Sequence, residues 1–456
     1  MPVAVAAEDS VDPGIWSAEY ESLMALIGGR FARCEAAAHA GDLVAGLVSD
    51  LERKNCWTIA ERVGHRTPGR LQHLLAGAVW DAEEVRDDLC GYAIDRLCEP
   101  GEEAVLVIDE TGDLKKGTRS VGVQRQYTGT AGRVENAQVA VFLTLVATHG
   151  HTFVDRALYL PECWANDTAR REQAGVPDDV EFATKPALAT EMIARAVATG
   201  APARWVAGDE VYGACPRLRA SCRQLKLGYV LAVGCNHRAT YPGAEEADRV
   251  DDLALSISPS QWQRLSAGSG SKGERLYSWT RIELAPENDP DTSEPSGGRH
   301  WLMIGRNDDT GEIAYYRCWH PHWVPLTQLV GVAGQRWHIE ENFQAGKGLA
   351  GLDEHQVRTW ASWHRWTTLA MAGHAFLTVI AHLARQADNN PETRGLIPYT
   401  VAETRRLFLA FWDRFPKLPA KAVWAWSQWR RRHQYQAHLS HYHRRGHPTP
   451  QPEVVL

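Results

Sequence analysis

The sequence predicts an α/β protein in which helices flank a mixed β-sheet. Three observations indicate this fold class. Short apolar runs rich in β-branched residues begin after Pro100, helical patterns alternate with them up to residue 235, and long helical segments precede and follow this region. With 456 residues, 44% of them apolar, the chain is long enough for two or three domains.

The charge of the chain is uneven. Asp and Glu number 56 and Lys and Arg 49, a formal net charge of −7, which by itself argues against nucleic-acid binding. The segment from Arg414 to Pro452 is an exception, because it has no acidic residue and includes Arg430, Arg431 and Arg432. This segment is either a surface that contacts DNA or a solvated basic helix and tail.

Cysteine usage and hydropathy bear on the compartment. The nine cysteines include no C-x-x-C pair and no metal-binding spacing, which favours a reduced, cytoplasmic protein. We find no run of about 18 apolar residues and no basic N-terminal region followed by an apolar one. We therefore expect neither a membrane span nor export.

The N-terminal part is predicted to be helical. Residues 1–19 are expected to be disordered, and residues 20–100 place apolar residues at three-and-four spacing. Short helices broken near Gly64 could form a DNA-binding helix-turn-helix. A plain helical bundle produces the same pattern, and we favour it.

Residues 101–235 change to strands and then alternate. "AVLVID" (104–109) is a short apolar strand, and "AVFLTLVATHGHTFVDRALYL" (140–160) predicts two strands around a turn. A helix, a strand, a helix and a strand follow. Three strands followed by these units have the order of the first half of the ribonuclease H fold.

The remaining regions are a β-rich insertion and a helical end. Residues 236–324 contain predicted strands in "RLYSWTRIEL", "RHWLMIGRN" and "GEIAYYRCW", and the loop 285–298 is expected to be disordered. Residues 325–385 should supply a helix to the core. Residues 386–456 are predicted to form a helical C-terminal region with a basic tail.

Two acidic residues end apolar strands. Asp109 ends "VLVID" and Asp209 ends "RWVAGD". Either one alone is more often a turn or cap residue. In a sheet of the predicted order the two strands can be neighbours, which would bring both carboxylates within reach of shared divalent cations.

A third carboxylate is expected from the helical stretch "GQRWHIEENFQAGKG" (334–348). Taking Arg336 as zero, Glu340 lies at about 40° and Lys347 at about 20° around the helix, whereas Glu341 lies at about 140°. Arg336 and Glu340 could simply be a pair on an exposed helix, but that leaves Lys347 without a role.

Together these blocks resemble the DDE superfamily of bacterial insertion-sequence transposases. The resemblance covers residues 20–380 and rests on "VIDETGDLKKGTRSVGVQRQYTGTAGRVENAQ", "GDEVYG", "GSKGERLYSW" and the helical stretch. One subgroup has a Tyr-x2-Arg-x3-Glu-x6-Lys signature. Arg336, Glu340 and Lys347 fit it, while Ala333 occupies the tyrosine position.

The resemblance implies a ribonuclease H-like catalytic core with Asp109, Asp209 and Glu340 as catalytic residues and metal ligands. They would hold two Mg²⁺ ions, for which Mn²⁺ could substitute, and would cut and join DNA. The implied partners are double-stranded transposon ends and target DNA, with a dimer in the DNA complex, at the nucleoid and without a membrane. The DNA contacts expected from this resemblance are Arg336, Lys347, Lys115, Lys116, Arg119 and Lys272, and the basic C-terminal segment adds Arg430, Arg431 and Arg432.

Other interpretations remain open. The chain could be a catalytically idle or domesticated transposase that only binds DNA, or another ribonuclease H-fold nuclease. A glycosidase with two carboxylates would leave the basic positions unexplained. Trp337 and Trp164 could stack on an unpaired base, although core packing is the stronger expectation for both.

Overall fold

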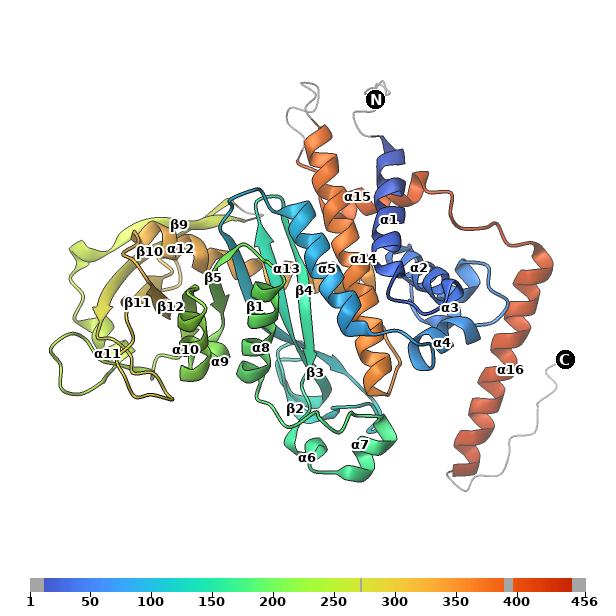
Figure 1. Cartoon of the computed structure of the whole chain (residues 1–456), viewed down its shortest axis with the longest axis horizontal. Coiled ribbons are helices and arrows are strands. Elements are labelled where there is room, and N and C mark those ends of the chain that lie inside the picture. The colour runs from blue at the N-terminus through green and yellow to red at the C-terminus, as the bar shows by residue number, and fades with distance from the viewer. Residues whose placement is uncertain (1–11, 271–272, 389–396, 445–456) are drawn as a thin grey trace.

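The computed structural model describes residues 12–270, 273–388 and 397–444. At its centre lies a mixed sheet in which neighbouring strands follow the order β4-β3-β1-β5-β6 (Figure 1). Strand β1 runs antiparallel to β3 and parallel to β5, and β5 is parallel to β6. This order confirms the predicted ribonuclease H-like core. The strands are β1 (Ala104–Leu114), β3 (Arg133–Ala147), β4 (Gly150–Leu158), β5 (Ala203–Gly208) and β6 (Gly228–Val233), and β2 (Gln124–Thr128) pairs with the start of β3.

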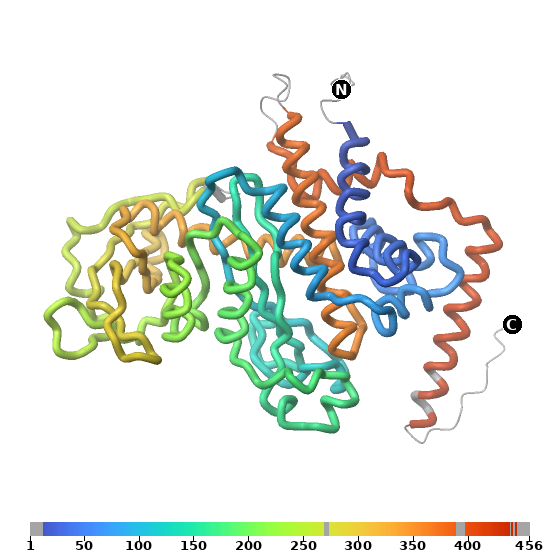
Figure 2. The backbone as a smooth tube through the Cα atoms, viewed as in Figure 1, coloured from blue at the N-terminus to red at the C-terminus, as the bar shows by residue number. Residues whose placement is uncertain are grey.

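The β-rich insertion extends this same sheet. Strand β12 pairs antiparallel with β6, and β11, β10 and β9 follow in turn, so the sheet reaches ten strands. Figure 2 shows the insertion, in yellow, at one end of the molecule. All three predicted strands are present. The insertion contains β7 (Arg238–Ala239), β8 (Asp248–Arg249), α11 (Val250–Leu255), β9 (Gln263–Gly270), β10 (Gly273–Leu284), β11 (Arg299–Arg306) and β12 (Ile313–His320), with a 3₁₀ turn at Pro259–Gln261.

The loop 285–298 is anchored, so the expectation of disorder there is wrong. Its Glu287 accepts hydrogen bonds from three buried arginines that lie outside the loop. The contacts are Arg219 Nη2 to Oε1 at 2.6 Å, Arg223 Nη1 to Oε2 at 2.9 Å and Arg317 Nη2 to Oε1 at 3.1 Å. We call these four residues the arginine cluster. Composition could not reveal it, because its partners come from β12 and from a helix some 65 residues earlier.

Helices cover both faces of the sheet. Alternate side chains of β1 point to opposite faces: Val105 and Val107 pack with α13 and α14, while Leu106 and Ile108 pack with α8 and α10. The first face carries α12 (Leu326–Gln335), α13 (Trp337–Ala350) and α14 (Trp360–Ala387). The second carries α8 (Lys185–Ala198) and α10 (Pro216–Gln224). Small helices α6 (Glu162–Ala165) and α7 (Thr168–Ala174) follow β4.

Helix α14 is the central core helix. By length and composition it could cross a membrane, although its sequence contains no unbroken run of 18 apolar residues. Within the fold, however, 94% of its most apolar window is buried. Its hydropathy is therefore accounted for by packing between the sheet and the N-terminal helices.

The N-terminal helices pack around α14, as the bundle interpretation predicts (Figure 1). They are α1 (Pro13–Gly28), α2 (Cys34–Val48), α3 (Cys56–Arg62), α4 (Gly69–Ala76) and α5 (Ala82–Leu97). Helix α1 starts earlier than expected, because Asp12 accepts a hydrogen bond from the Gly14 amide at 2.8 Å and Trp16 is buried. Disorder up to residue 19 is thus wrong for residues 13–19, and residues 1–11 lie outside the described part.

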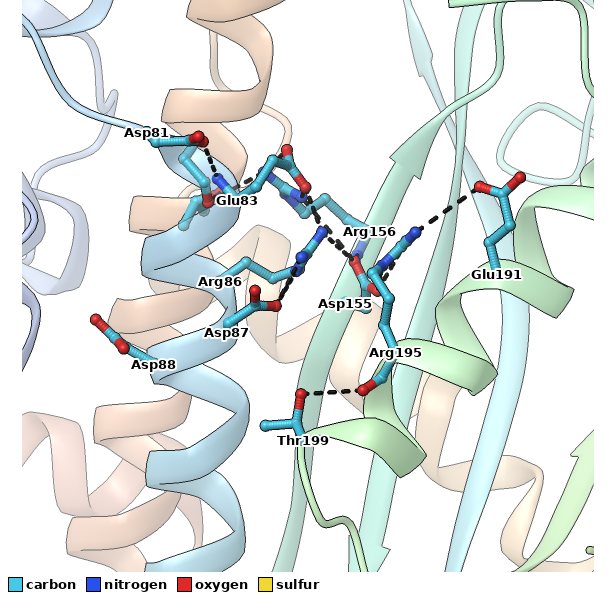
Figure 3. A network of polar contacts seen from close by, with 12 residues as sticks. Asp81, Glu83, Arg86, Asp87, Asp88, Asp155, Arg156, Glu191, Arg195 and Thr199 are labelled. Atoms are coloured by element: carbon cyan, nitrogen blue, oxygen red, sulfur yellow. Dashed lines mark hydrogen bonds and ion pairs between the residues drawn. The ribbon is translucent and has the colours of Figure 1, made fainter. Parts of the chain in front are cut away.

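A polar network ties α5 and α8 to strand β4 (Figure 3). Arg156 on β4 donates from Nη2 to Glu83 Oε1 at 2.8 Å, and its neighbour Asp155 accepts from Arg195 Nε at 3.0 Å. Arg86 of α5 lies 3.6 Å from Asp155. Because Asp155 and Arg156 are buried, these pairs supply the partners that buried charges require.

The C-terminal helices are α15 (Val401–Phe411) and α16 (Ala420–Arg444). Helix α16 lies on the outside of the N-terminal helices, in red at the edge of the molecule (Figure 2). Its Trp429 ring packs on Trp57 of α3 with centroids 4.6 Å apart. Trp426 Nε1 donates to the His65 carbonyl at 3.1 Å, and Arg430 forms an ion pair with Glu61.

Candidate active site

The register of β1 and β5 places the two predicted aspartates side by side. The strands are parallel, and Ile108 lies opposite Gly208, so Asp109 and Asp209 are the next residues on neighbouring strands. One expectation is wrong: β1 continues to Leu114, so Asp109 lies within its strand. Only β5 ends here, and Asp209 then caps the short helix α9 (Glu210–Gly213) by accepting from the Val211 amide at 2.9 Å.

Helix α13 brings Glu340 to the same place. Asp109 has the same strand parity as Val105 and Val107, which pack on this face with α13. A groove of about 2020 Å³ is lined by Asp109, Asp209 and Glu340. These three carboxylates, which we call the acidic cluster, come from two strands and a helix separated by about 100 and 130 residues of sequence.

Two predicted cations also line this groove. Arg336 joins α12 to α13 with helical dihedral angles, φ −56° and ψ −30°, so the helical phase continues across the junction. Its Nη1 lies 3.3 Å from Asp109 Oδ2. Lys347 donates from Nζ to Thr111 Oγ1 at 2.8 Å. Arg336, Glu340 and Lys347 thus occur together, as helical phase predicts.

Electrostatics distinguish Asp109 from an ordinary aspartate. Burial raises the pKa of Asp109 to about 7, and the negative charges of Asp209 and Glu340 add to the rise. The Glu110 amide, which donates to Asp109 Oδ1 at 2.7 Å, and the Arg336 guanidinium only partly oppose it. Burial, followed by the charge of Glu110, also raises the pKa of Asp209.

The acidic cluster fits a divalent cation. Its donor set consists of carboxylate oxygens, which Mg²⁺ and Mn²⁺ prefer. Its negative charge is concentrated where burial already disfavours ionisation of Asp109. A bound cation would relieve both penalties, so Asp109, Asp209 and Glu340 are the side chains that could hold such a metal.

Sequence reasoning missed a second layer of contacts. Glu110 has the strand parity of Leu106 and Ile108, which pack on the opposite face. It accepts from Tyr212 Oη at 2.7 Å and forms an ion pair with Lys185 at the start of α8. The alternation of β1 could have assigned Glu110 to that face, but no sequence signal links it to Lys185, 75 residues away.

The remaining predicted DNA contacts are scattered. Lys116 and Arg119 are exposed beyond the end of β1, whereas Lys115 is partly buried, with Nζ 3.9 Å from Asp113 Oδ2. Burial lowers the pKa of Lys115. Lys272 lies outside the described residues. On α16, Arg430 is paired with Glu61, and the exposed pair is Arg431 and Arg432.

The two candidate tryptophans differ. Trp164 is 2% exposed and donates from Nε1 to the Val123 carbonyl at 2.8 Å, as core packing predicts. Trp337 is 55% exposed and lines the groove, so the expectation of core packing is wrong for it. Ala333, at the usual tyrosine position, lines an adjoining pocket of about 280 Å³ with Tyr277 and Tyr316.

Comparisons with known proteins agree with this architecture. Residues 28–252 match a family model described as DDE superfamily endonuclease. A curated relative from Microchaete diplosiphon, a probable transposase for insertion sequence element IS701, is 34% identical over 313 residues, which is 63% of this chain and 77% of the relative.

Solved structures show weaker likenesses. A piggyBac transposase synaptic complex with hairpin DNA is similar over 87% of this chain and 79% of that one, at 11% identity and a TM-score of 0.41. The NurA nuclease from Sulfolobus solfataricus is similar over 61% and 82%, at 8% identity and a TM-score of 0.26. Since both scores are low, the assignment rests on the family model and the curated relative: this chain belongs to the DDE superfamily of insertion-sequence transposases.

Proposed function

We propose that this transposase cuts and joins the ends of an insertion sequence by phosphodiester hydrolysis followed by strand transfer. The observation that carries this proposal is the convergence of Asp109, Asp209 and Glu340 on one open groove. A fold alone does not specify a reaction. Three carboxylates that converge can bind cations or exchange protons, so they restrict the reactions that the groove could support.

Asp109, Asp209 and Glu340 would hold the divalent metal, Mg²⁺ or Mn²⁺. Bound in pairs, such ions activate the attacking oxygen, of water or of a DNA 3′-hydroxyl, and stabilise the leaving oxygen of an in-line displacement. The raised pKa of Asp109 supports this role, because a carboxyl group that resists ionisation when alone gains most from a neighbouring cation.

The basic residues of the groove would position the DNA backbone. Arg336 lies 3.3 Å from Asp109 in the structure, and a cation on Asp109 would leave this guanidinium available to a phosphate. Lys347 lies about three helical turns beyond Arg336 along α13 and offers a second positive charge to the same strand. The proposed partners are double-stranded transposon ends and target DNA, bound by a dimer at the nucleoid.

The test uses the full chain and a linear duplex that carries the inverted repeats flanking its own gene. With Mg²⁺ we expect cleavage at the repeat ends and joining to a target plasmid, both detected on sequencing gels. Asp109→Asn should lose both activities while retaining binding to the duplex. If wild type binds the repeats but cuts nothing with Mg²⁺ or Mn²⁺, the chain is a DNA-binding protein and the catalytic proposal fails.

A further inference from the structure

A second group of possible metal ligands lies beside the acidic cluster and plays no part in the reaction proposed above. His338 and Glu341 lie on the first turns of α13, and His151 lies at the start of β4. Their ligand atoms all fall within 4.8 Å of one another. Glu341 lines the same groove as Glu340 but lies about 100° further around the helix, where it contacts the two histidines and not the acidic cluster.

The spacing of these atoms fits tetrahedral coordination. His151 Nε2 lies 3.3 Å from Glu341 Oε2, and His338 Nδ1 lies 2.8 Å from the same oxygen. Zinc bonds to nitrogen and oxygen are about 2.0–2.2 Å long, which puts neighbouring tetrahedral ligands about 3.3 Å apart. The His151–Glu341 distance matches this spacing, whereas His338 lies closer to Glu341, and the two histidine rings stack with centroids 4.3 Å apart, so the rings must turn to bind one ion.

The tautomer of His151 is set by a buried neighbour. Asn342 donates from Nδ2 to Thr144 Oγ1 at 3.1 Å, so its Oδ1 faces His151 Nδ1 at 2.6 Å as an acceptor. His151 Nδ1 must then carry the proton. The Nε2 of His151 is then the ring atom that faces the Glu341 carboxylate, where it can either donate a proton to that carboxylate or bind a cation shared with it.

We propose that His151, His338 and Glu341 form a zinc site that ties strand β4 to the catalytic helix α13. Two imidazoles and one carboxylate suit Zn²⁺, whereas Mg²⁺ prefers oxygen ligands alone. Asn342 provides the outer hydrogen bond that orients histidine ligands in metal sites. The three side chains are 25–45% exposed, so the ion can enter from solvent. The ion would fix the turn of α13 that carries Glu340.

The experiment uses untagged full-length protein, freed of metal with a chelator and then held in excess Mg²⁺ to fill the acidic cluster. Titration with Co²⁺ should produce visible absorption of a nitrogen-ligated ion at one equivalent per chain, and Zn²⁺ should displace it. Saturating Zn²⁺ should raise the melting temperature by roughly 3–6 °C. His338→Gln and Glu341→Gln should each weaken binding at least about 100-fold and abolish the thermal shift.

Two controls separate this site from others. Asp109→Asn changes the acidic cluster and should leave Zn²⁺ binding intact. The triple variant His438→Gln/His441→Gln/His443→Gln removes imidazoles of the C-terminal segment and should also leave it intact. Binding that survives in His338→Gln, or is lost in the triple variant, would overturn the proposal, as would no binding in excess Mg²⁺.

X-ray absorption of the wild-type zinc complex covers the case in which a variant fails to fold. Two imidazoles in the first coordination shell are expected, and a shell without imidazole would overturn the assignment. Failure here leaves the cleavage assay with Mg²⁺ unaffected, so the zinc site and the proposed reaction are tested separately.

Discussion

The acidic cluster and the arginine cluster are two groups of charges with opposite compositions, and each has buried members: Asp109 in the first and the three arginines in the second. In the arginine cluster, one carboxylate accepts hydrogen bonds from three arginines. Burial alone would raise the pKa of Glu287, but Arg219, Arg317 and Arg223 outweigh it and lower the pKa to about 2. In the acidic cluster burial prevails, and the pKa of Asp109 is raised to about 7.

This difference is the one expected between a charge that stabilises the fold and a charge that awaits a ligand. The protein itself supplies the partners that the Glu287 carboxylate needs, and this carboxylate holds the loop in place. The acidic cluster is left with more negative charge than its arginine compensates. An excess of negative charge lowers the stability of the folded protein. Proteins keep such an excess where a ligand supplies the missing positive charge.

The largest expected effect distinguishes neighbouring glutamates of α13. Glu340→Gln should reduce Mg²⁺-dependent cleavage at least about 1000-fold, because it removes a carboxylate from the acidic cluster. Glu341→Gln, assayed with Mg²⁺ alone, should lose far less, since Glu341 faces His151 and His338. Gel assays of end cleavage with equal amounts of bound DNA provide the measurement. Equal losses in the two variants would contradict the assignment of Glu340.

The next effect concerns stability and tests the arginine cluster. Glu287→Gln should lower the free energy of unfolding by about 3 kcal/mol at pH 7, because three buried arginines lose their counter-charge. The folded-state pKa lies below the ordinary value of 4.5, so wild type has this stabilisation above pH 4.5 and loses it as the pH falls towards 2. The difference between wild type and variant should therefore shrink in acid.

Urea unfolding at pH 7 and pH 3.5 measures this difference. Glu294→Gln, an exposed change in the same loop, is the matched control and should alter stability by less than about 0.5 kcal/mol. An equal cost for both substitutions, or a cost for Glu287→Gln that grows in acid, would show that the arginine cluster does not anchor the loop.

The acidic cluster should respond with the opposite sign. The folded protein keeps a proton on Asp109 up to about pH 7, whereas the unfolded chain releases it near 3.8, so wild type loses stability as the pH rises between these values. Asp109→Asn avoids this loss and should stabilise the metal-free protein by about 1–3 kcal/mol at pH 8, and by less at pH 5. Thermal melting in the presence of a chelator measures this difference in stability. Added Mg²⁺ should reduce the difference, because the ion stabilises the wild type alone. A destabilised variant at pH 8 would contradict the view that the cluster is strained without a cation.

The sequence predicted much of the groove because its signals are local. The apolar strands fixed the order of the core, and helical phase placed Arg336, Glu340 and Lys347 together. The prediction that Asp109 ends its strand was wrong. Strand β1 continues beyond its apolar half, and the residues after Asp109 form no apolar run that would reveal this continuation. The burial of Lys115 was also missed, because it depends on Asp113 and His355, and His355 is 240 residues away.

Long-range pairing also explains the errors outside the groove. The composition of the loop 285–298 is typical of disorder, yet Glu287 anchors it to three arginines from distant segments and Trp319 Nε1 donates to its Gly297 carbonyl. Trp337 is exposed because it lies at the junction of α12 and α13, beside the groove. The residues around it in the sequence nevertheless resemble those of a buried helix. Such contacts depend on tertiary packing, so the residue type at one position does not reveal them.

The smallest expected effect concerns charges that belong to neither cluster. Arg431 and Arg432 are exposed on α16, while the adjacent Arg430 is held by Glu61. Because these two arginines are exposed, their charges are available to phosphates of bound DNA. Arg431→Gln/Arg432→Gln should weaken DNA binding a few-fold and reduce the slope of log affinity against log salt by about 1–2, with no change in melting temperature. Fluorescence anisotropy at several salt concentrations measures that slope. If this slope is unchanged in the variant, α16 is a solvated helix whose tryptophans pack on α3. Its positive charge then keeps the protein soluble and does not bind DNA.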